Sequence, residues 1–433
     1  MAEVTSKMVP IPSKGVDYRG KLVLAPMVRT GEMPLRLLAL HYGADLVWGP
    51  ETVDYSLIGT TRVVNPTTKT VDFIRNPSYA HRHTPVNARE SIIYRLHPEL
   101  EGRKHIFQIG TANPERAVTA ARIIAADVAG IDVNAGCPKP FSTHDGMGAA
   151  LLKTPDKLVS ILEALVKEIV PEFQIGISVK IRILETAAET EALVRRLVAT
   201  GITALTVHCR TTPMRPREKA IRGQLKMVAD ICREAGVACL MNGDVEDRDS
   251  AKKLVEEFGV DGAMIATAAE KNPSCFRSQA DGGLAPWQEV VSKYMEYTMD
   301  SENKYGNTKY VLSRLVPGKK PAYQLLQTCK SYSAVCDTLG LDDFTERAKA
   351  ADIAVGITKD PNPQAKLQPT ATTTTATATA STTMTTTASI EKRKSDDTQE
   401  VTSSAKRQRV VEEQTAQGIT EIEPVQPAVA LSA

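Results

Sequence analysis

The sequence of 433 residues lacks long hydrophobic runs, a bias of charge and paired cysteines. No 18 consecutive apolar residues occur, so we expect no membrane-spanning helix. The first 20 residues contain no hydrophobic segment of the kind found in secretory signals, so export is not expected. Lys and Arg total 53 while Asp and Glu total 51, so the overall charge favours no class of partner.

The seven cysteines are scattered and form no CxxC pair, which argues against a zinc site and against a disulfide framework. The sequence also has no HExxH motif, no histidine cluster with metal spacing, and no pair of carboxylates at the ends of predicted strands. We therefore predict no metal site and expect a protein of a reducing compartment, either the cytosol or the nucleus.

The C-terminal segment 359–433 differs in composition from the rest of the chain. It contains the Thr- and Ala-rich stretch PNPQAKLQPTATTTTATATASTTMTTTASI and continues as a polar, charged tail. With few large apolar residues it cannot bury enough surface to offset the entropy of ordering, so we predict disorder. Two basic clusters between Lys392 and Arg409, KRK and KRQR, resemble a bipartite nuclear-import signal, although such clusters also arise by chance in a solvated tail.

Short apolar runs alternate with stretches of helical periodicity between residues 20 and 283. Eight runs have the nearly continuous apolar character of strands that are covered on both faces. They occupy residues 22–27, 44–49, 105–110, 130–136, 177–182, 204–210, 238–244 and 262–267. Eight such units predict a closed (β/α)8 TIM barrel. A doubly wound sheet is the alternative, but APMVRTGEMP after the first run contains no GxGxxG phosphate motif.

Three further regions flank or interrupt the predicted barrel. Residues 1–19 form an N-terminal extension. Residues 51–104 are an insertion too long for a simple connection, and we expect 71–74 and 91–96 to form an antiparallel addition beside the barrel mouth. Residues 284–358 have helical periodicity and are more basic than the barrel. We predict that they form a second, all-helical domain.

Polar residues and glycines follow almost every predicted strand. Since the active groups of such barrels lie at the C-terminal strand ends, we expect these residues to share one rim. Amide and cationic groups suit a planar heterocycle with carbonyl and imide groups on which reduction builds negative charge. Glycine-bearing ends of the last two strands suit a phosphate group, so together the rim predicts bound FMN. The strand-end residues are Pro26, Met27, Glu51, Gln108, Asn134 to Cys137, Lys180 to Arg182, His208 to Arg210, Asn242, Gly243, Asp244, Ala266 and Thr267.

Cys137 ends the fourth predicted strand, within the stretch GIDVNAGCPKPFSTHDGMGAAL. Pro138 cannot extend a strand, and Gly136 permits backbone conformations that other residues avoid. A lone cysteine is commonly a buried structural thiol. Its place among the rim residues favours a catalytic thiol instead.

Several stretches resemble those of the tRNA-dihydrouridine synthase family: LAPMVRTGEMPLRLLALHYGAD, NAGCPKPFSTHDGMGAALL, VKIRI, VHCRTTPMRPRE, NGDVEDRD and DGAMIATAAEKNPSCF. The resemblance covers residues 20 to 350, and its GCPK…GMGAALL and MRPRE blocks are most similar to the eukaryotic, fungal-like type that modifies position 20 of the D-loop. It implies an FMN barrel, a helical tRNA-binding domain and NADPH-driven reduction of uridine to 5,6-dihydrouridine. Some animal relatives carry a double-stranded-RNA-binding domain where this chain has its Thr-rich tail.

The resemblance also implies roles for individual residues. Cys137 is implied as the proton donor, with Asn134 and Arg182 directed at the uracil. The flavin contacts implied by position are Pro26, Met27, Val28, Gln108, Lys180, His208, Asn242, Gly243, Asp244, Ala266 and Thr267. Many members of the family carry an arginine on the FMN phosphate where this chain has Thr267. We therefore predict weaker retention of FMN, because a charge-assisted contact is about twice as strong as a neutral one.

A thiol suits the role of acid because an unperturbed thiol, with a pKa of about 8.5, is protonated at pH 7, whereas an exposed carboxylic acid is ionised. The implied partners are tRNA and NADPH, with no membrane, and a monomer is expected. Two alternatives stay open: an FMN-dependent reductase or dehydrogenase of a free pyrimidine, and a catalytically silent barrel that binds RNA. The basic residues expected to contact tRNA phosphates are Lys293, Lys304, Lys309, Arg314, Lys319, Lys320, Lys330, Arg215, Arg217, Lys219 and Arg222.

Overall fold

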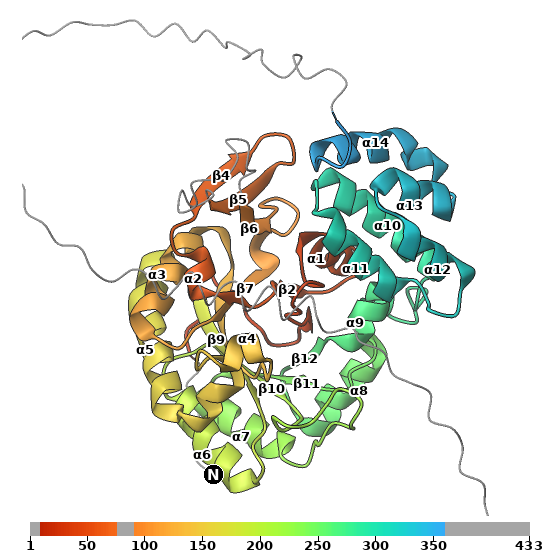
Figure 1. The fold of residues 1–433 in the computed structure, drawn as a ribbon. Helices are drawn as coiled ribbons and strands as arrows, with labels where there is room; N and C mark the ends of the chain where they lie inside the picture. The colour runs from red at the N-terminus through yellow and green to blue at the C-terminus, as the bar shows by residue number, and fades with distance from the viewer. Residues whose placement is uncertain (1–8, 76–90, 360–433) are drawn as a thin grey trace, which may run out of the picture. The chain divides into compact units, whose positions relative to one another are not determined.

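Eight parallel strands close into a barrel in the computed structural model, which describes residues 9–75 and 91–359. Each strand pairs with its neighbour, and β2 also pairs with β7 to complete the ring. This closure confirms the predicted TIM barrel and excludes an open doubly wound sheet (Figure 1). The barrel strands are β1 (Leu22–Leu24), β2 (Leu46–Trp48), β7 (His105–Gly110), β8 (Gly130–Ala135), β9 (Gly176–Arg182), β10 (Ala204–His208), β11 (Ala238–Asn242) and β12 (Gly262–Ile265).

Helices follow the strands as the periodicity predicts. Several end at a glycine in the left-handed region, such as Gly236 after α7 (φ 72°) and Gly259 after α8 (φ 65°), which lets the chain turn back into the next strand. Two short helices, α2 (Asp54–Leu57) and α4 (Pro140–Thr143), lie in connections. The longer helices of the barrel are α1 (Met33–His41), α3 (Pro114–Ile124), α5 (Pro155–Phe173), α6 (Ala187–Val198), α7 (Leu225–Ala235) and α8 (Arg248–Phe258).

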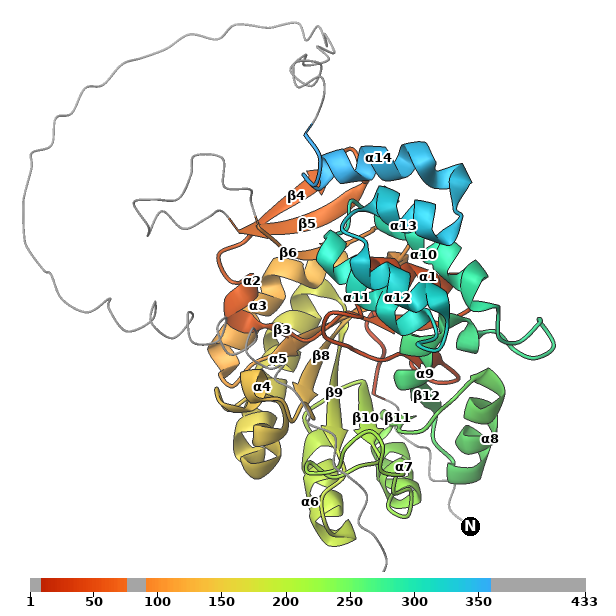
Figure 2. The same cartoon turned by 45° about the vertical axis from the view of Figure 1, so that its right-hand side comes forward.

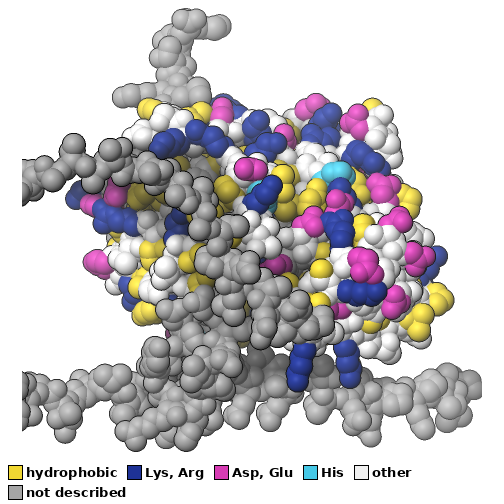
Figure 3. All heavy atoms as spheres, turned by 90° about the horizontal axis from the view of Figure 1, so that it is seen from above, with side chains coloured by type: hydrophobic (Ala, Val, Ile, Leu, Met, Phe, Trp, Pro, Cys, Tyr) yellow, Lys and Arg dark blue, Asp and Glu magenta, His cyan; other side chains and the backbone are white. Residues whose placement is uncertain are grey.

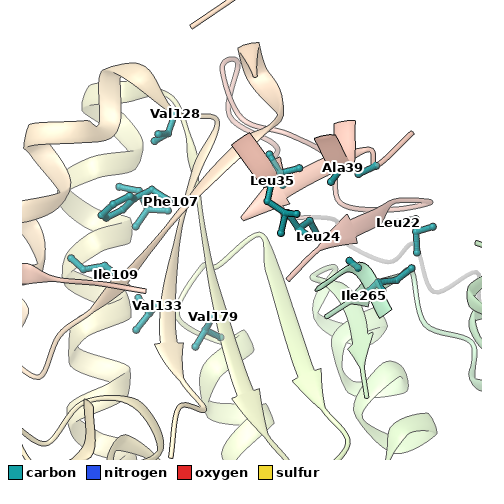
Figure 4. Close-up of a cluster of buried hydrophobic side chains, with 14 of the residues drawn as sticks. Leu22, Leu24, Leu35, Ala39, Phe107, Ile109, Val128, Val133, Val179 and Ile265 are labelled. Atoms are coloured by element: carbon teal, nitrogen blue, oxygen red, sulfur yellow. The ribbon is translucent and has the colours of Figure 1, made fainter. Parts of the chain in front are cut away.

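Side chains along each strand point alternately outward and inward, and they form two separate apolar clusters. Outward residues such as Phe107, Val133 and Val179 pack in the layer between strands and helices (Figure 4). Inward residues such as Trp48 and Leu240 fill the barrel interior. Apolar side chains therefore fill much of the barrel interior, and the polar inward-facing side chains lie near the C-terminal ends of the strands.

The insertion between β2 and β7 forms a separate antiparallel sheet. It contains β4 (Thr61–Asn65), β5 (Thr70–Arg75) and β6 (Ser91–Leu96), in the order β4-β5-β6. The predicted strands at 71–74 and 91–96 are confirmed as part of β5 and β6, whereas β4 was not predicted. A short strand, β3 (Thr52–Val53), pairs with β7 at the barrel wall.

A buried ion pair attaches this insertion to the barrel. The guanidinium of Arg36 on α1 bonds both carboxylate oxygens of Glu101, with an Nε–Oε1 distance of 2.6 Å, and also donates to the carbonyl of Arg95 at 2.8 Å. Both charged side chains are 1% exposed. Burial opposes ionisation of Glu101, but Arg36 and His105 outweigh it and lower the pKa of that carboxyl.

Five helices follow the barrel and lie beside α1 and the insertion (Figures 1 and 2). They are α10 (Trp287–Asp300), α11 (Tyr305–Leu315), α12 (Pro321–Thr328), α13 (Tyr332–Leu339) and α14 (Thr345–Ala354). The side-chain amide of Asn307 on α11 donates a hydrogen bond to Glu32 at the start of α1. Because barrel and helices belong to one compact unit, the domain boundary at residues 283–284 stays a prediction.

Within the described ranges, no helix combines the length and the apolar character needed to cross a membrane. The predicted disorder and basic clusters of segment 360–433 lie outside the described residues.

Candidate active site

The inward-facing residues near the C-terminal ends of β8 to β11 are polar and lie at matching levels. Register places Asn134 opposite Lys180, and His208 opposite both Arg182 and Asn242. The barrel wall thus brings together five of the predicted site residues from four neighbouring strands. Their roles in binding or catalysis stay predictions.

Lys180 supplies a cation at the barrel mouth. Its Nζ donates to Oδ1 of Asn242 at 3.1 Å, and the amide nitrogen of Asn242 in turn donates to the carbonyl of Met264 at 2.9 Å. Burial, together with the charge of Arg182, lowers the pKa of Lys180 from 10.5 to about 8. The ammonium is therefore largely charged at pH 7 but loses its charge in mildly alkaline solution.

His208 is neutral at physiological pH. Burial is the largest cause, and the cations Lys180, Arg182 and Arg210 add to it, so the pKa of His208 falls to about 2. Nη1 of Arg210 lies 3.2 Å from Nε2 of His208. Since a guanidinium can only donate, Nε2 is the acceptor and the ring proton is on Nδ1. The protein therefore offers a neutral ring at this position.

Gln108 lies one layer deeper than the other predicted residues. Its amide nitrogen donates to Asp132 at 2.7 Å, and its carbonyl oxygen accepts from Asn134 at 2.9 Å. Ser178 donates to the other oxygen of Asp132 at 2.7 Å. Burial raises the pKa of Asp132 to about 6. The amide nitrogen and the carbonyl oxygen of Gln108 both have protein partners, and the residue is fully buried. In this structure Gln108 therefore orients Asn134. Its direct contact with a flavin stays a prediction.

Sequence reasoning missed Asp132 and Ser178 as members of this network. Both occupy inward positions of otherwise apolar strands, so the alternation of β8 and β9 carried a signal for them.

Asn134 and Arg182 hold the backbone that carries Cys137. Oδ1 of Asn134 accepts hydrogen bonds from the N–H groups of Gly136 and Cys137, at 3.0 and 2.9 Å. Nε of Arg182 donates to the carbonyl of Gly136 at 2.7 Å, and its Nη1 donates to Thr211 at 3.0 Å. Both residues predicted to bind uracil therefore also fix the loop after β8.

Cys137 is partly exposed, whereas the other six cysteines are buried, and all seven are free thiols. Its thiol faces Glu51, which follows β2, and Ser142 on α4. Burial, followed by the negative charge of Glu51, raises the pKa of Cys137 to about 12. The thiol therefore stays protonated through neutral pH, by a wider margin than an unperturbed cysteine.

Gly243 shapes the opposite part of the mouth, between β11 and β12. Its φ of 119° is rarely adopted by other residues, and a Cβ there would lie 3.2 Å from Cβ of Ala220 and 3.4 Å from Cδ2 of His208. Ala266 is partly buried, and the neighbouring Thr267 is exposed as the first residue of the five-residue helix α9 (Thr267–Lys271). Gly243 is therefore required by its backbone conformation and by its packing against Ala220 and His208, and its carbonyl accepts a hydrogen bond from Arg222 at 3.1 Å.

Arg210 ties the basic loop 211–221 to the barrel. It donates to the carbonyls of Glu218 and Pro216 and pairs with the carboxylate of Asp244. Burial opposes ionisation of Asp244, yet the hydrogen bond from Arg210 and that from the Ala220 N–H lower the pKa of this carboxyl. Arg210 was noted as a strand-end residue, but its role in holding this loop was not predicted.

Pro26, Met27 and Val28 follow β1 at the same end of the barrel. Pro26 and Met27 are partly buried, and the Met27 carbonyl accepts from the N–H of Gly31 at 2.7 Å. Val28 is 47% exposed, so its side chain is accessible at this end of the barrel.

The residues at this mouth fit a flavin with a phosphate. Lys180 provides a cation beside the amide of Asn242, apolar surface is available at Met27 and Val28, and Thr267 is exposed at the start of α9. In the described ranges, no group of three or more His, Cys, Asp or Glu side chains could hold a metal ion.

A second cavity, of about 850 Å³, lies between the insertion and the helices. Its lining includes Glu32, Arg36, Tyr94, Arg95 and Asn307, and none of the predicted site residues. It is therefore separate from the barrel mouth.

A family model described as dihydrouridine synthase matches residues 23–351. The chain belongs to the dihydrouridine synthase family.

Curated relatives agree with this assignment and confirm the predicted family. The Schizosaccharomyces pombe protein named tRNA-dihydrouridine(20) synthase (NAD(P)+) is 49% identical over 322 residues, which cover 73% of this chain and 64% of that protein. The chain thus spans less than two thirds of that relative. The Saccharomyces cerevisiae protein of the same name is 46% identical over 323 residues, covering 73% of this chain and 82% of that protein. A Homo sapiens protein named tRNA-dihydrouridine(20a/20b) synthase (NAD(P)+)-like is 28% identical, covering 74% and 91%.

The basic residues predicted to contact nucleic acid divide into two groups in this member of the dihydrouridine synthase family. Lys309 donates to the carbonyls of Gln327 and Cys329, Lys293 pairs with Glu296, and Arg222 donates to the carbonyls of Gly243 and Asp244. The exposed members are Lys304, Arg314, Lys319, Lys320, Lys330, Arg215, Arg217 and Lys219. Figure 3 shows basic side chains interspersed with acidic ones on one face, so positive charge there is distributed.

Proposed function

We propose that this chain reduces the C5–C6 double bond of uridine in tRNA, at position 20 of the D-loop, to 5,6-dihydrouridine, with FMN as cofactor and NADPH as electron donor. The observation that carries the proposal is the partly exposed Cys137 thiol at the mouth of a barrel of this family, where Asn134, which lies opposite Lys180, fixes its backbone. The names of the two yeast relatives support the position and the electron donor.

The cofactor would be held by side chains that line the mouth. Lys180 and Asn242 would contact its polar ring edge, Met27 would pack on its face, and the backbone at Gly243 and Thr267 would meet its phosphate. When bound, FMN supplies the hydride that is added to C6 of the uracil. The Lys180 cation favours the negative charge that reduction places on the ring.

Cys137 supplies the second hydrogen. Addition of hydride at C6 leaves negative charge on the C5 side of the uracil, and the thiol donates its proton to C5. Arg182 and Asn134 would stabilise this charge at the uracil carbonyl groups. A uridine within folded tRNA reaches such a mouth only after it leaves its stack, so the base is flipped outward for the reaction.

The exposed cations of loop 211–221 and of the helical region would contact tRNA phosphates. Arg215 and Arg217 lie on the loop that Arg210 attaches to the barrel mouth, and Lys319 and Lys320 immediately precede α12. Such contacts position the substrate without reading its bases, and they weaken as salt concentration rises.

A test uses the purified full chain with NADPH, FMN and unmodified tRNA, followed by position-resolved mass spectrometry. Reduction adds two hydrogen atoms, so uridine 20 should gain about 2 Da. Parallel incubation with free dihydroorotate tests the alternative of a free-pyrimidine enzyme. Turnover of dihydroorotate without modification of tRNA would contradict the proposal.

A further inference from the structure

Three segments that are distant in sequence converge at the Cys137 thiol. Glu51 follows β2, Ser142 lies on α4, and Cys137 follows β8. Oγ of Ser142 donates a hydrogen bond to Oε1 of Glu51 at 2.8 Å. The hydroxyl therefore fixes the carboxylate, whose charge is directed at the thiol.

Two glycines provide the space for this arrangement. A Cβ at Gly110 would lie 2.7 Å from Oε1 of Glu51. A Cβ at Gly148 would lie 2.4 Å from Oγ of Ser142 and 3.2 Å from Cβ of Cys137. Any larger residue at either position would displace the carboxylate, the hydroxyl or the thiol. The contact between Glu51 and Ser142 therefore requires glycine at both positions.

The second carboxylate oxygen of Glu51 has no protein partner. Oε2 is buried, and no side chain or backbone group of the described residues donates a hydrogen bond to it by the usual geometry. A buried acceptor without a donor is unfavourable, and the S–H group of Cys137 faces it. The thiol can therefore turn its hydrogen toward Glu51 when no substrate is present.

We propose that Glu51 is the positioning residue for Cys137: its carboxylate, anchored by Ser142, orients the thiol and disfavours its ionisation. This inference rests on the proposed function, because it concerns the form of the thiol that the reaction consumes. It assigns a role to a residue that makes no contact with the cofactor or the tRNA in that proposal.

The groups around the thiol act in opposite directions. Lys180 and Arg182 on β9 favour the thiolate, as do the hydrogen bonds from the backbone at Lys139 and from the hydroxyl of Ser142. Burial and Glu51 oppose it and prevail. Without the Glu51 carboxylate, the effect of these cations and donors on the thiol would be less strongly opposed.

The proton balance requires the thiol form at the start of each turnover. The S–H bond of Cys137 breaks as the C5–H bond forms, after hydride from the reduced flavin has been added to C6. The resulting thiolate then takes a proton from water. The sum is uridine, NADPH and one proton giving dihydrouridine and NADP+, so a cysteine that begins as thiolate cannot complete the step.

The test measures how fast iodoacetamide alkylates Cys137 between pH 6 and pH 11, with the modified peptide followed by mass spectrometry on the purified full chain. The thiolate is the reacting form, and this range lies below the midpoint of Cys137, where the rate rises with the thiolate fraction. At each pH on this slope we expect Glu51→Gln to be alkylated about tenfold faster than wild type. The control Glu163→Gln, an exposed glutamate of α5, should leave the rates unchanged. Equal rates for Glu51→Gln and wild type would overturn the proposal.

Two further variants keep the result interpretable. Glu51→Asp retains the charge and should restore most of the wild-type profile. If Glu51→Gln does not fold, Glu51→Ala replaces it, and equal rates for Glu51→Ala and wild type overturn the proposal by themselves.

A second measurement links the thiol to the reaction. At pH 7, oxidation of the reduced flavin by tRNA should be slower in Glu51→Gln than in wild type, because the thiol is no longer oriented, whereas reduction by NADPH should keep its rate. If alkylation changes but the tRNA half-reaction does not, the catalytic part of the inference fails. If wild type forms no dihydrouridine, the proposed function fails, and the alkylation profile still decides the role of Glu51.

Discussion

The side-chain oxygen of Asn134 accepts a hydrogen bond from the backbone N–H of Cys137 at 2.9 Å. The last inward residue of β8 thereby fixes the start of the loop that carries the thiol. Since the amide of Asn134 is itself bonded to Gln108, the position of Cys137 depends on a chain of contacts that begins inside the barrel. The site is supported by strands, although its reactive group lies on a loop.

Replacing Asn134 by Ala should impair the tRNA reaction more than the flavin reaction. The change leaves the N–H groups of Gly136 and Cys137 without their acceptor, at a cost of about 1–3 kcal/mol for each group that stays buried. We expect at least a tenfold slower formation of dihydrouridine, which corresponds to about 1.4 kcal/mol, and nearly normal reduction of flavin by NADPH, both measured by stopped-flow absorbance.

Asn65→Ala is the matched control for this change. Asn65 likewise accepts hydrogen bonds from two backbone N–H groups, those of Thr67 and Thr68 at 2.9 and 3.2 Å, in the turn between β4 and β5 of the insertion. Its loss should lower stability by about 1 kcal/mol and leave both half-reactions intact. Equal effects of the two variants on dihydrouridine formation would show that Asn134 acts only through stability.

The charge of Lys180 should give the reductive half-reaction an alkaline limit. Its pKa of about 8 means that the cation is present below pH 8 and is lost as pH rises through that value. We expect NADPH-driven reduction of the flavin to slow above pH 8 in wild type. Lys180→Arg should extend activity to higher pH because a guanidinium stays charged, and Lys180→Met should be slow at every pH. A wild-type rate that stays constant from pH 7 to 9.5 would contradict this account.

Gly49 should not tolerate a side chain. A Cβ there would lie 1.7 Å from the hydroxyl oxygen of Tyr94, which also bonds His105. We expect Gly49→Ala to lower the free energy of unfolding by about 1–3 kcal/mol, seen as a lower midpoint in thermal or urea unfolding. Gly306→Ala in α11 serves as control, because nothing lies within 4 Å of its Cβ, and it should stabilise the chain by about 0.5–1 kcal/mol. Unfolding of Gly49→Ala at the wild-type midpoint would refute the packing described.

The barrel could be predicted from sequence because its strands carry a local signal. Runs such as 130–136 and 177–182 are apolar at outward positions and end in polar residues or glycine. The strand β4 was missed for the opposite reason. Most of Thr61–Asn65 is exposed and polar, so the segment lacks the alternation of apolar and polar residues that predicts a strand. Its pairing with β5 could therefore not be predicted from sequence.

The site was only partly predictable for a related reason. Cys137 and Lys180 could be placed at strand ends, and the topology then brings those ends together. The contact of Glu51 with Ser142 depends on how two loops fold over the closed barrel, and no local pattern in either segment specifies it. The engagement of Gln108 with Asp132 likewise appears only when the inward residues of neighbouring strands are in register.

Thr267 should limit the affinity for FMN. It is exposed at the start of α9, where an arginine side chain could approach a phosphate bound near Gly243. We expect Thr267→Arg to bind FMN about tenfold more tightly in equilibrium dialysis, because a charge-assisted contact contributes about 1.5–3 kcal/mol at most. Thr119→Arg adds the same charge on the exposed face of α3 and should have no effect. An affinity that rises little in Thr267→Arg would refute the idea.

Cys137→Ala should separate the two half-reactions. The variant retains the residues that would hold the flavin, so bound cofactor and NADPH oxidation should be preserved. Formation of dihydrouridine should fall by at least a hundredfold, because the proton donor is absent. Normal modification of tRNA by this variant would remove Cys137 from the mechanism.

The most direct test of the central claim is position-resolved mass spectrometry of tRNA from cells that lack this protein. The account predicts uridine in place of dihydrouridine at position 20. It further predicts recovery when the wild-type chain is returned and none when Cys137→Ala is returned. Dihydrouridine at position 20 in undiminished amount in the deficient cells would contradict it.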